Sequence, residues 1–264
     1  MAEDIVKSSL HNLISRIVDR MKGLLVIFIF FGLWELLPRV GIIKPSLLPP
    51  FSTVVVVMVK FILGGKFAKH LLISLKRAGT GFFMALAVSI PMGICIGSYR
   101  GFAKFVEPLI QFLRQTAALA LYPMFILFLG LGETSKIAIV FWSAQWAILL
   151  NTISGVMYVN PTLINAAKSM GASNLRVLFT VVLPDAMPSI MTGVRLSATQ
   201  SILSLVAAEM IGSNSGLGFL ILNSQYNFQI HLMYASILYI AILGLIVNYI
   251  LAWLERKTVM WKRE

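Results

Sequence analysis

The chain has 264 residues, of which 58% are hydrophobic and only 12% are charged, and its mean hydropathy is +0.88. A soluble domain carries about 25% charged residues because its hydrated surface needs them, so this composition excludes an ordinary soluble enzyme. The net charge of +12 does not indicate nucleic-acid binding, because the basic residues are spread over the gaps between apolar segments. There they can contact anionic lipid headgroups. We therefore expect a protein of the lipid bilayer with no nucleic-acid partner.

No residue pattern indicates a catalytic or metal-binding site. Cys95 is the only cysteine, so neither an intrachain disulfide nor a cysteine-based metal site can form. The three histidines, His11, His70 and His231, lie far apart without ligand-like spacing. Nucleotide-binding, dinucleotide-binding and zinc-protease motifs are not found. We therefore predict that the chain is not an enzyme and that it binds no metal or other cofactor itself.

Apolar segments recur along the chain at lengths that approach the ~20 residues needed to cross a bilayer core of about 30 Å. Because lipid offers no partner for unpaired backbone groups, these segments should be helices. The sequence thus predicts an all-α integral membrane protein with about six transmembrane helices, which form one domain over residues 1–264. The expected spans are residues 24–38, 78–98, 108–130, 137–159, 187–211 and 233–254.

The basic residues indicate which side of the membrane each loop occupies. If the N-terminus is cytoplasmic, the loops on that side, which include Arg100, Lys168 and Arg256, hold more Lys and Arg than the outer loops. This bias follows the positive-inside rule, and an even number of spans returns the chain to its starting side. We therefore expect a multi-pass protein of the cytoplasmic (inner) membrane with both termini in the cytoplasm.

The first outer loop, which should extend to Arg77, contains a short apolar segment, FSTVVVVMVKFILGG. Prolines precede it, and Ser52 or Thr53 could cap a helix that ends at Gly64. The segment is too short to cross the bilayer, so we expect a helix that lies in the membrane interface. A β-strand through Val54–Val57 is the alternative.

Residues 160–188 form a longer connection than two neighbouring spans need. Apolar residues at helical spacing indicate two short helices, with Gly171 at the break between them. Ser173 is a candidate N-cap of the second helix, and Pro184 should end that helix. We expect residues 160–184 to lie at the cytoplasmic surface and to bind another protein.

This loop resembles the EAA loop of bacterial ATP-binding-cassette (ABC) importer permeases. That motif reads roughly Glu-Ala-Ala, three residues, Gly, nine residues and Ile-x-Leu-Pro, and residues 165–167, Gly171 and residues 181–184 have the same spacing. The departure is Asn165, which replaces the motif's Glu and removes its charge. The predicted ATPase-coupling residues are Asn165, Ala166, Ala167, Gly171, Leu175, Leu178, Leu183 and Pro184.

Further segments are similar to the permeases of nitrate, taurine and alkanesulfonate importers, the NitT/TauT branch of this superfamily. They are Leu47–Pro50, His70–Arg77, Gly130–Ile137 and Ala207–Gly218, so the resemblance covers most of the chain between residues 45 and 220. After Arg114 the chain reads QTAALALYP, where the branch often has a Pro-rich segment with a Trp. Because this segment lies in the third expected span, the substrate could differ from those of the branch.

The resemblance implies the MetI-like architecture of a binding-protein-dependent importer permease. Such a permease would form a homodimer in the bilayer, with one cytoplasmic ATPase subunit docked on each 160–184 loop and a substrate-binding protein docked outside. The ATPases would bind ATP and Mg²⁺ and switch the permease between inward and outward openings. The expected substrate is a small anion such as taurine, an alkanesulfonate or nitrate.

Polar residues within the expected spans are candidates for a translocation path, because charged groups inside a bilayer are costly and usually face the bundle interior. Arg114 and Arg195 could instead extend to the headgroups, and Glu209 could line an outer gate or anchor a helix by a hydrogen bond. Trp142 and Trp146 share a helix face and could either pack or form an aromatic wall of the path. The predicted path or gate residues are Arg114, Gln115, Asn151, Arg195, Gln200 and Glu209.

Three alternatives remain open from the sequence. An ion-coupled secondary transporter could use Glu209 or Glu35 as a proton carrier, although such proteins usually contain internal repeats and none is evident. An intramembrane enzyme would need clustered His, Asp or Cys within the spans, and these are missing. A permease of the same family with a different small organic substrate is the third.

Overall fold

The computed structural model describes residues 25–258, and this part of the chain contains helices and loops but no β-strand. A first helix covers residues 25–39. It is followed by α2 (Phe51–Leu63), α3 (Lys66–Ser98), α4 (Arg100–Gln115), α5 (Ala118–Leu129), α6 (Glu133–Met157), α7 (Pro161–Ser169), α8 (Asn174–Val177), a π-helical turn (Leu178–Val182), α9 (Leu183–Gly212), α10 (Leu217–Tyr226) and α11 (Ile230–Thr258).

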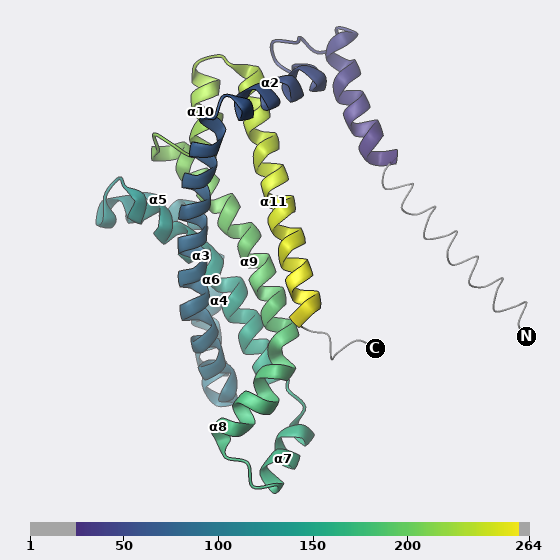
Figure 1. The fold of residues 1–264 in the computed structure, drawn as a ribbon. Coiled ribbons are helices and arrows are strands. Elements are labelled where there is room, and N and C mark those ends of the chain that lie inside the picture. Colours follow the sequence, from purple (N-terminus) through teal and green to yellow (C-terminus); the bar gives the residue numbers. More distant parts are fainter. Residues whose placement is uncertain (1–24, 259–264) are drawn as a thin grey trace, which may run out of the picture.

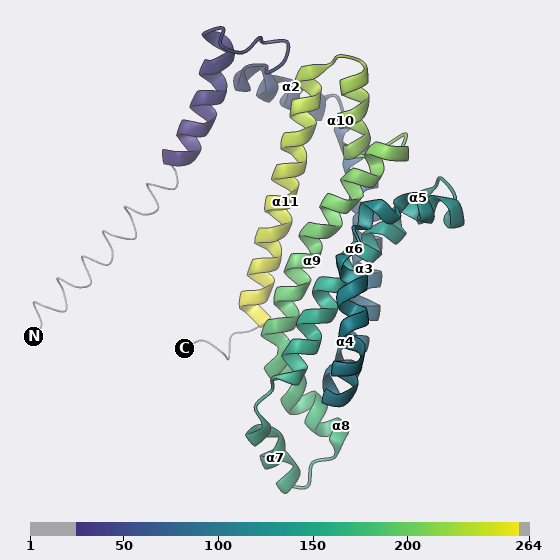
Figure 2. The same cartoon turned by 180° about the vertical axis from the view of Figure 1, so that it is seen from behind.

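The helices α3, α6, α9 and α11 run along an elongated bundle (Figure 1). The helices α7 and α8 lie at one end, here called the loop end, and α2 and α10 lie at the other, here called the α2 end (Figures 1 and 2). Among the described residues, α3, α6, Asn174–Gly212 and α11 are long and apolar enough to cross a membrane, and the bent pair of α4 and α5 would make a fifth. The all-α membrane fold is thus confirmed, whereas the first expected span, residues 24–38, begins outside the described residues.

Two helices extend beyond the spans expected at residues 78–98 and 187–211. α3 already begins at Lys66, so the residues up to Arg77 that were assigned to an outer loop are helical. The second short helix was predicted to end at Pro184, but a π-helical turn joins α8 to α9. In this turn the Leu183 N–H donates to the Leu178 carbonyl. Pro184 lies in the first turn of α9, where a proline is tolerated.

The third expected span, residues 108–130, is not one straight helix. α4 and α5 meet at an angle of 86°. Neither Thr116 nor Ala117, which lie between them, is a proline or glycine, the usual local causes of a sharp kink. Tyr122 of α5 is fully buried against residues of α3, α6 and α9. The packing of Tyr122 thus holds α5 in place after the bend.

The short helix expected in the first outer loop is α2, and the β-strand alternative is not observed. Its N-cap is Pro50, not Ser52 or Thr53. The Ser52 N–H and hydroxyl instead donate to the Glu35 carboxylate at 2.9 and 2.8 Å, and Glu35 also pairs with Arg39. These bonds attach the first helix to α2 at the α2 end.

The segment after α6 consists of two short helices, α7 and α8, with a break at Gly171. The φ angle of Gly171 is +80°, a left-handed conformation that favours glycine because it has no Cβ. The Ser173 hydroxyl accepts a hydrogen bond from the Arg176 N–H at 3.4 Å and caps α8. The helix–break–helix shape inferred from the sequence is therefore present.

A row of small residues on α3 forms the contact with α6. Gly81, Ala85, Ser89, Gly93 and Gly97 recur every fourth residue and are all buried. A Cβ added at Gly93 would lie 2.7 Å from the Thr152 Cβ, and those added at the other two glycines would also overlap α6. Small residues let two helix backbones approach closely, which is how helices pack where lipid removes the hydrophobic driving force.

The outer faces of the bundle are apolar. α11 exposes Leu245, Ile246 and Ile250, and only 6% of its most apolar segment, which has a mean hydropathy of 2.3, is buried inside the chain. An exposed apolar surface of this extent requires lipid or another protein rather than water. The structure thus accounts for the low charge content of the sequence.

We predict that Gly93→Ala destabilises the bundle, because the added methyl group would overlap Thr152. Overpacking of this kind costs about 1–3 kcal/mol, so the melting temperature of the detergent-solubilised protein should fall. Gly79→Ala is the matched control on the same helix, since nothing lies within 4 Å of its added Cβ. Its expected effect is neutral or slightly stabilising, because alanine favours a helix over glycine. Equal melting temperatures for the two variants would contradict the close α3–α6 contact.

Candidate functional site

A cavity of about 490 Å³ lies where the α4–α5 bend meets α6 and α9. Four of the predicted path residues line it, namely Arg114, Gln115, Asn151 and Gln200. Arg114 and Gln115 are the last two residues of α4, so the bend brings them against α6 and α9. The structure therefore brings together residues of three helices, which the sequence indicated only as separate candidates.

Arg114 carries the only charge among the described residues that line this cavity. Its side chain is exposed and makes no ion pair or hydrogen bond with another described residue. Its place in the last turn of α4 suits a cation, because the helix dipole is negative there. The amide of Asn151 donates to the Ala147 carbonyl at 2.8 Å, whereas Gln115 and Gln200 are exposed. The cavity thus offers one free positive charge and neutral polar groups.

Trp142 and Trp146 form one wall of the cavity. Their rings meet edge to face with centroids 5.2 Å apart. Both indole N–H groups are buried and have no hydrogen-bond partner among the described residues. The two rings pack against each other, and their role as an aromatic wall of the path stays a prediction.

Arg195 lies outside the cavity. Its guanidinium pairs with the Glu255 carboxylate at 2.9 Å, and this ion pair connects α9 to the end of α11. Both side chains are partly exposed. Arg195 was predicted to line the path, but the described contacts give it a role in joining two helices.

Glu209 also lies outside the cavity, in a buried polar cluster near the α2 end. Its carboxylate is completely buried and pairs with Arg77 at 2.7 Å. It also accepts hydrogen bonds from the Ser74 hydroxyl at 2.8 Å and from the Gly218 N–H at 2.9 Å. Arg77 in turn pairs with Glu133 at 2.5 Å. This cluster connects α3, α6, α9 and α10, which matches the helix-anchoring alternative for Glu209.

The loop between α9 and α10 closes over this cluster. The Ser215 carbonyl accepts a hydrogen bond from Arg77 at 2.7 Å, and the Gly216 N–H donates to Nδ1 of His70 at 3.1 Å. Gly216 has φ +119°, and a Cβ there would overlap the Glu209 carboxylate. The glycine is therefore required both by its backbone conformation and by the carboxylate beside it.

Sequence reasoning missed Arg77, because it assigned the segment before residue 78 to a loop. The row of small residues on α3 gives the signal that was available. Ser74 and Ala78 continue this row of small buried residues toward the N-terminus at the helical spacings of three and four residues. A helix that begins before Ser74 follows from this spacing, and it places Arg77 next to the buried face.

The predicted coupling residues divide into exposed and packed groups. Asn165, Ala166, Gly171 and Leu175 are exposed at the loop end, where Met170 adds further apolar surface that sequence reasoning did not single out. The half-buried members are Ala167, Leu178, Leu183 and Pro184, of which the first three pack against the apolar core. A cleft of about 570 Å³ separates α7 and α8 from the ends of α3 and α6. The loop thus presents an apolar surface on a packed base.

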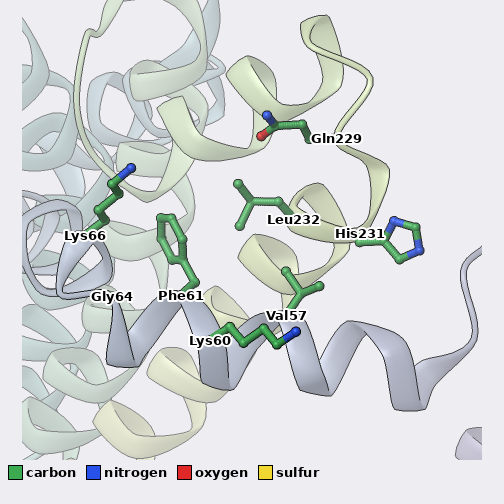
Figure 3. Close-up of a pocket in the computed structure, with 8 residues that line it drawn as sticks. All are labelled: Val57, Lys60, Phe61, Gly64, Lys66, Gln229, His231 and Leu232. Atoms are coloured by element: carbon green, nitrogen blue, oxygen red, sulfur yellow. The ribbon is translucent and has the colours of Figure 1, made fainter.

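A second groove, of about 520 Å³, lies at the α2 end (Figure 3). It is formed by α2, the start of α3 and the start of α11. The predicted site residues do not line it. Its lining residues are Val57, Lys60, Phe61, Gly64, Lys66, Gln229, His231 and Leu232.

Comparison with known proteins assigns the family. Residues 85–260 match the family described as binding-protein-dependent transport system inner membrane component. The chain belongs to this family. A chain of the MetNI methionine ABC transporter in its inward-facing conformation has the same fold, with a TM-score of 0.63 at 16% identity over 72% of this chain and 94% of that chain. The MetI-like architecture implied by the loop motif is therefore confirmed.

Two curated relatives identify the branch. The permease is 32% identical to the putative aliphatic sulfonates transport permease protein SsuC of Bacillus subtilis (strain 168), over 92% of this chain and 88% of that protein. It is 30% identical to the taurine transport system permease protein TauC of Escherichia coli (strain K12), over 95% of this chain and 92% of that protein. The permease thus belongs to the NitT/TauT branch that the sequence motifs indicated.

We expect Arg77→Met to destabilise the permease strongly, because it leaves the buried Glu209 carboxylate without its cationic partner. Removing one member of a buried ion pair costs about 3–5 kcal/mol, so the melting temperature in detergent should fall sharply. The double variant Arg77→Met with Glu209→Met removes both charges and should recover part of the loss. Lys76→Met, at the neighbouring exposed position, is the control and should have little effect. Wild-type stability of Arg77→Met would refute the anchoring role.

Proposed function

We propose that this ABC importer permease carries a small anion, such as taurine, an alkanesulfonate or nitrate, across the cytoplasmic membrane, and that separate ATPase subunits supply the energy. The observation that carries this proposal is the cavity at the α4–α5 bend, in which the free Arg114 is the only charge among the described lining residues. A positive charge without a carboxylate partner attracts an anion, and hydrogen bonds to ionised acceptors are stronger than neutral ones. The names of the sulfonate and taurine relatives support the same class of substrate.

The proposed assembly contains two copies of the permease, two ATPase subunits that bind ATP and Mg²⁺, and one external substrate-binding protein. One ATPase docks on each loop end, where Leu175 and Met170 are exposed with 69% and 83% of their surface accessible. The binding protein contacts the opposite end of the bundle. The basic residues expected on the loop side of the bilayer support a cytoplasmic location for the loop end and for both termini.

The contacts of Glu209 and Glu35 give less support to the alternative function, an ion-coupled secondary transporter. A proton carrier must be able to lose and regain its proton during transport. Glu209 is held by Arg77, Ser74 and the Gly218 N–H. The Glu35 carboxylate accepts two hydrogen bonds from Ser52 and lies outside the long helices of the bundle. Both candidate carboxylates are thus engaged in contacts that join helices.

The test is ATP-dependent uptake of labelled taurine by proteoliposomes that contain the permease with its ATPase and binding protein. Arg114→Leu should lower this uptake by roughly tenfold to a hundredfold, since it removes a charge-assisted hydrogen bond worth about 1.5–3 kcal/mol. Arg114→Lys keeps the charge and should retain part of the uptake. ATPase co-purification should remain normal in both variants.

Arg195→Leu is the matched comparison for this experiment. It also removes an arginine from the bundle, but its partner Glu255 is partly exposed and it lies outside the cavity. We expect uptake within a few-fold of wild type. Equal losses in Arg114→Leu and Arg195→Leu would remove the special role of the cavity, and uptake driven by an ion gradient without ATP would favour the secondary transporter.

Gly171→Val should weaken ATPase docking without removing the permease from the membrane. Nothing lies within 4 Å of a Cβ added at Gly171, so the change causes no clash. A β-branched residue is strained at φ +80°, however, and it would redirect the loop. We predict that less ATPase co-purifies and that substrate-stimulated ATP hydrolysis is lost.

Two variants control for this effect. Gly171→Asn should retain most docking, because asparagine tolerates the left-handed conformation better than valine. Gly101→Val changes another glycine whose added Cβ meets nothing within 4 Å, but in a helix. Full ATPase stoichiometry and activity in Gly171→Val would contradict a coupling role for the loop.

A further inference from the structure

The groove at the α2 end combines an apolar floor with a basic rim (Figure 3). In the view of Figure 3, Phe61 and Leu232 lie between Lys66 on one side and His231 on the other, and Lys60 lies below them on α2. The described lining contains no Asp or Glu. The side-chain ammonium groups of Lys60 and Lys66 make no ion pair or hydrogen bond with any described residue. The groove therefore holds two free positive charges next to an apolar surface.

The residues around the groove indicate its depth in the membrane. α2 lies across the end of the bundle rather than along it (Figures 1 and 2). It exposes Val56, Val59 and Ile62, which are disfavoured in water, yet its 13 residues cannot cross a bilayer. A helix with this combination lies in the interface between headgroups and acyl chains.

Aromatic residues at the same end support this depth. Trp34 and Tyr234 stack edge to face with ring centroids 5.8 Å apart. The indole N–H of Trp34 donates to the Pro49 carbonyl at 3.1 Å, and the Tyr234 hydroxyl donates to the Leu47 carbonyl at 3.1 Å. Trp and Tyr concentrate at the headgroup level because their rings are apolar and their tips are polar. Their position supports a place for the groove at the headgroup level of the bilayer.

We propose that this groove binds an anionic phospholipid, with the phosphate at its basic rim and an acyl chain over Phe61 and Leu232. A zwitterionic headgroup neutralises its own phosphate, so it gains less from two lysines than a net anionic one. The lipid spans the junction of α2 with α3 and α11, and it thereby strengthens the attachment of α2 to the bundle. This site is independent of the transported substrate.

The experiment titrates purified permease in detergent with phosphatidylglycerol or phosphatidylcholine and counts bound lipid by native mass spectrometry. Wild type should bind one phosphatidylglycerol more tightly than any phosphatidylcholine. Lys60→Gln and Lys66→Gln should each weaken that binding about fivefold, since a basic residue near an anionic surface contributes about this factor. Lys69→Gln is the matched control, because Lys69 is exposed at the same end but does not line the groove.

A second readout is the melting temperature of the permease in nanodiscs of phosphatidylcholine or of an equal mixture with phosphatidylglycerol. Phosphatidylglycerol should raise the melting temperature of wild type and of Lys69→Gln, but not of the variant with both groove lysines replaced. Unchanged phosphatidylglycerol affinity in that variant would overturn the proposal. So would displacement of the lipid by inorganic phosphate, which would reveal a free-anion site. If the variant with both groove lysines replaced still binds lipid but no longer contacts the binding protein, the groove is instead a protein-docking surface.

Discussion

The buried ion pair between Arg77 and Glu209 is the constraint on which the α2 end of the permease depends. Taking two charges out of water is costly, and their attraction offsets that cost only when further hydrogen bonds satisfy the remaining donors and acceptors. Here Ser74, Glu133 and the backbone of the α9–α10 loop supply those bonds. A Cβ at residue 216 would overlap the Glu209 carboxylate, and the Gly218 N–H attaches α10 to the same carboxylate. Because the cluster includes α3, α6, α9 and α10, it fixes four elements at once.

The candidate path involves α6 and α9 as well, but at other positions along these helices than the ion cluster. α6 carries Glu133 at its first turn and Asn151 further along, whereas α9 carries Gln200 and then Glu209. The polar groups of the cavity are therefore attached to helices that are anchored at one end by the ion cluster and joined along α3 by small residues. The bend between α4 and α5 adds Arg114 from the side. A rigid frame of this kind can hold a few polar groups around a small solute while the loop end remains available to a partner.

Much of the fold follows from the sequence, because apolar segments of bilayer length allow little other than helices. The loop motif and Gly171 also gave the shape of α7 and α8, since a left-handed residue and an N-cap are local features. The α4–α5 bend was not predictable, because it depends on the burial of Tyr122 among three other helices. For the same reason, polarity alone could not separate Arg114, which lines a cavity, from Arg195 and Glu209, which have carboxylate and guanidinium partners. Pairing is a property of the tertiary structure, and a single sequence does not record it.

The most direct measurement is a cryo-electron microscopy structure of the permease assembled with its ATPase and binding protein in the presence of taurine. We predict density for the solute in the cavity at the α4–α5 bend, with its sulfonate within hydrogen-bond distance of the Arg114 guanidinium and beside Trp142. The Arg77–Glu209 pair should be unchanged in that state. Solute density against Arg195 or within an opened Arg77–Glu209 cluster, with the cavity empty, would contradict it.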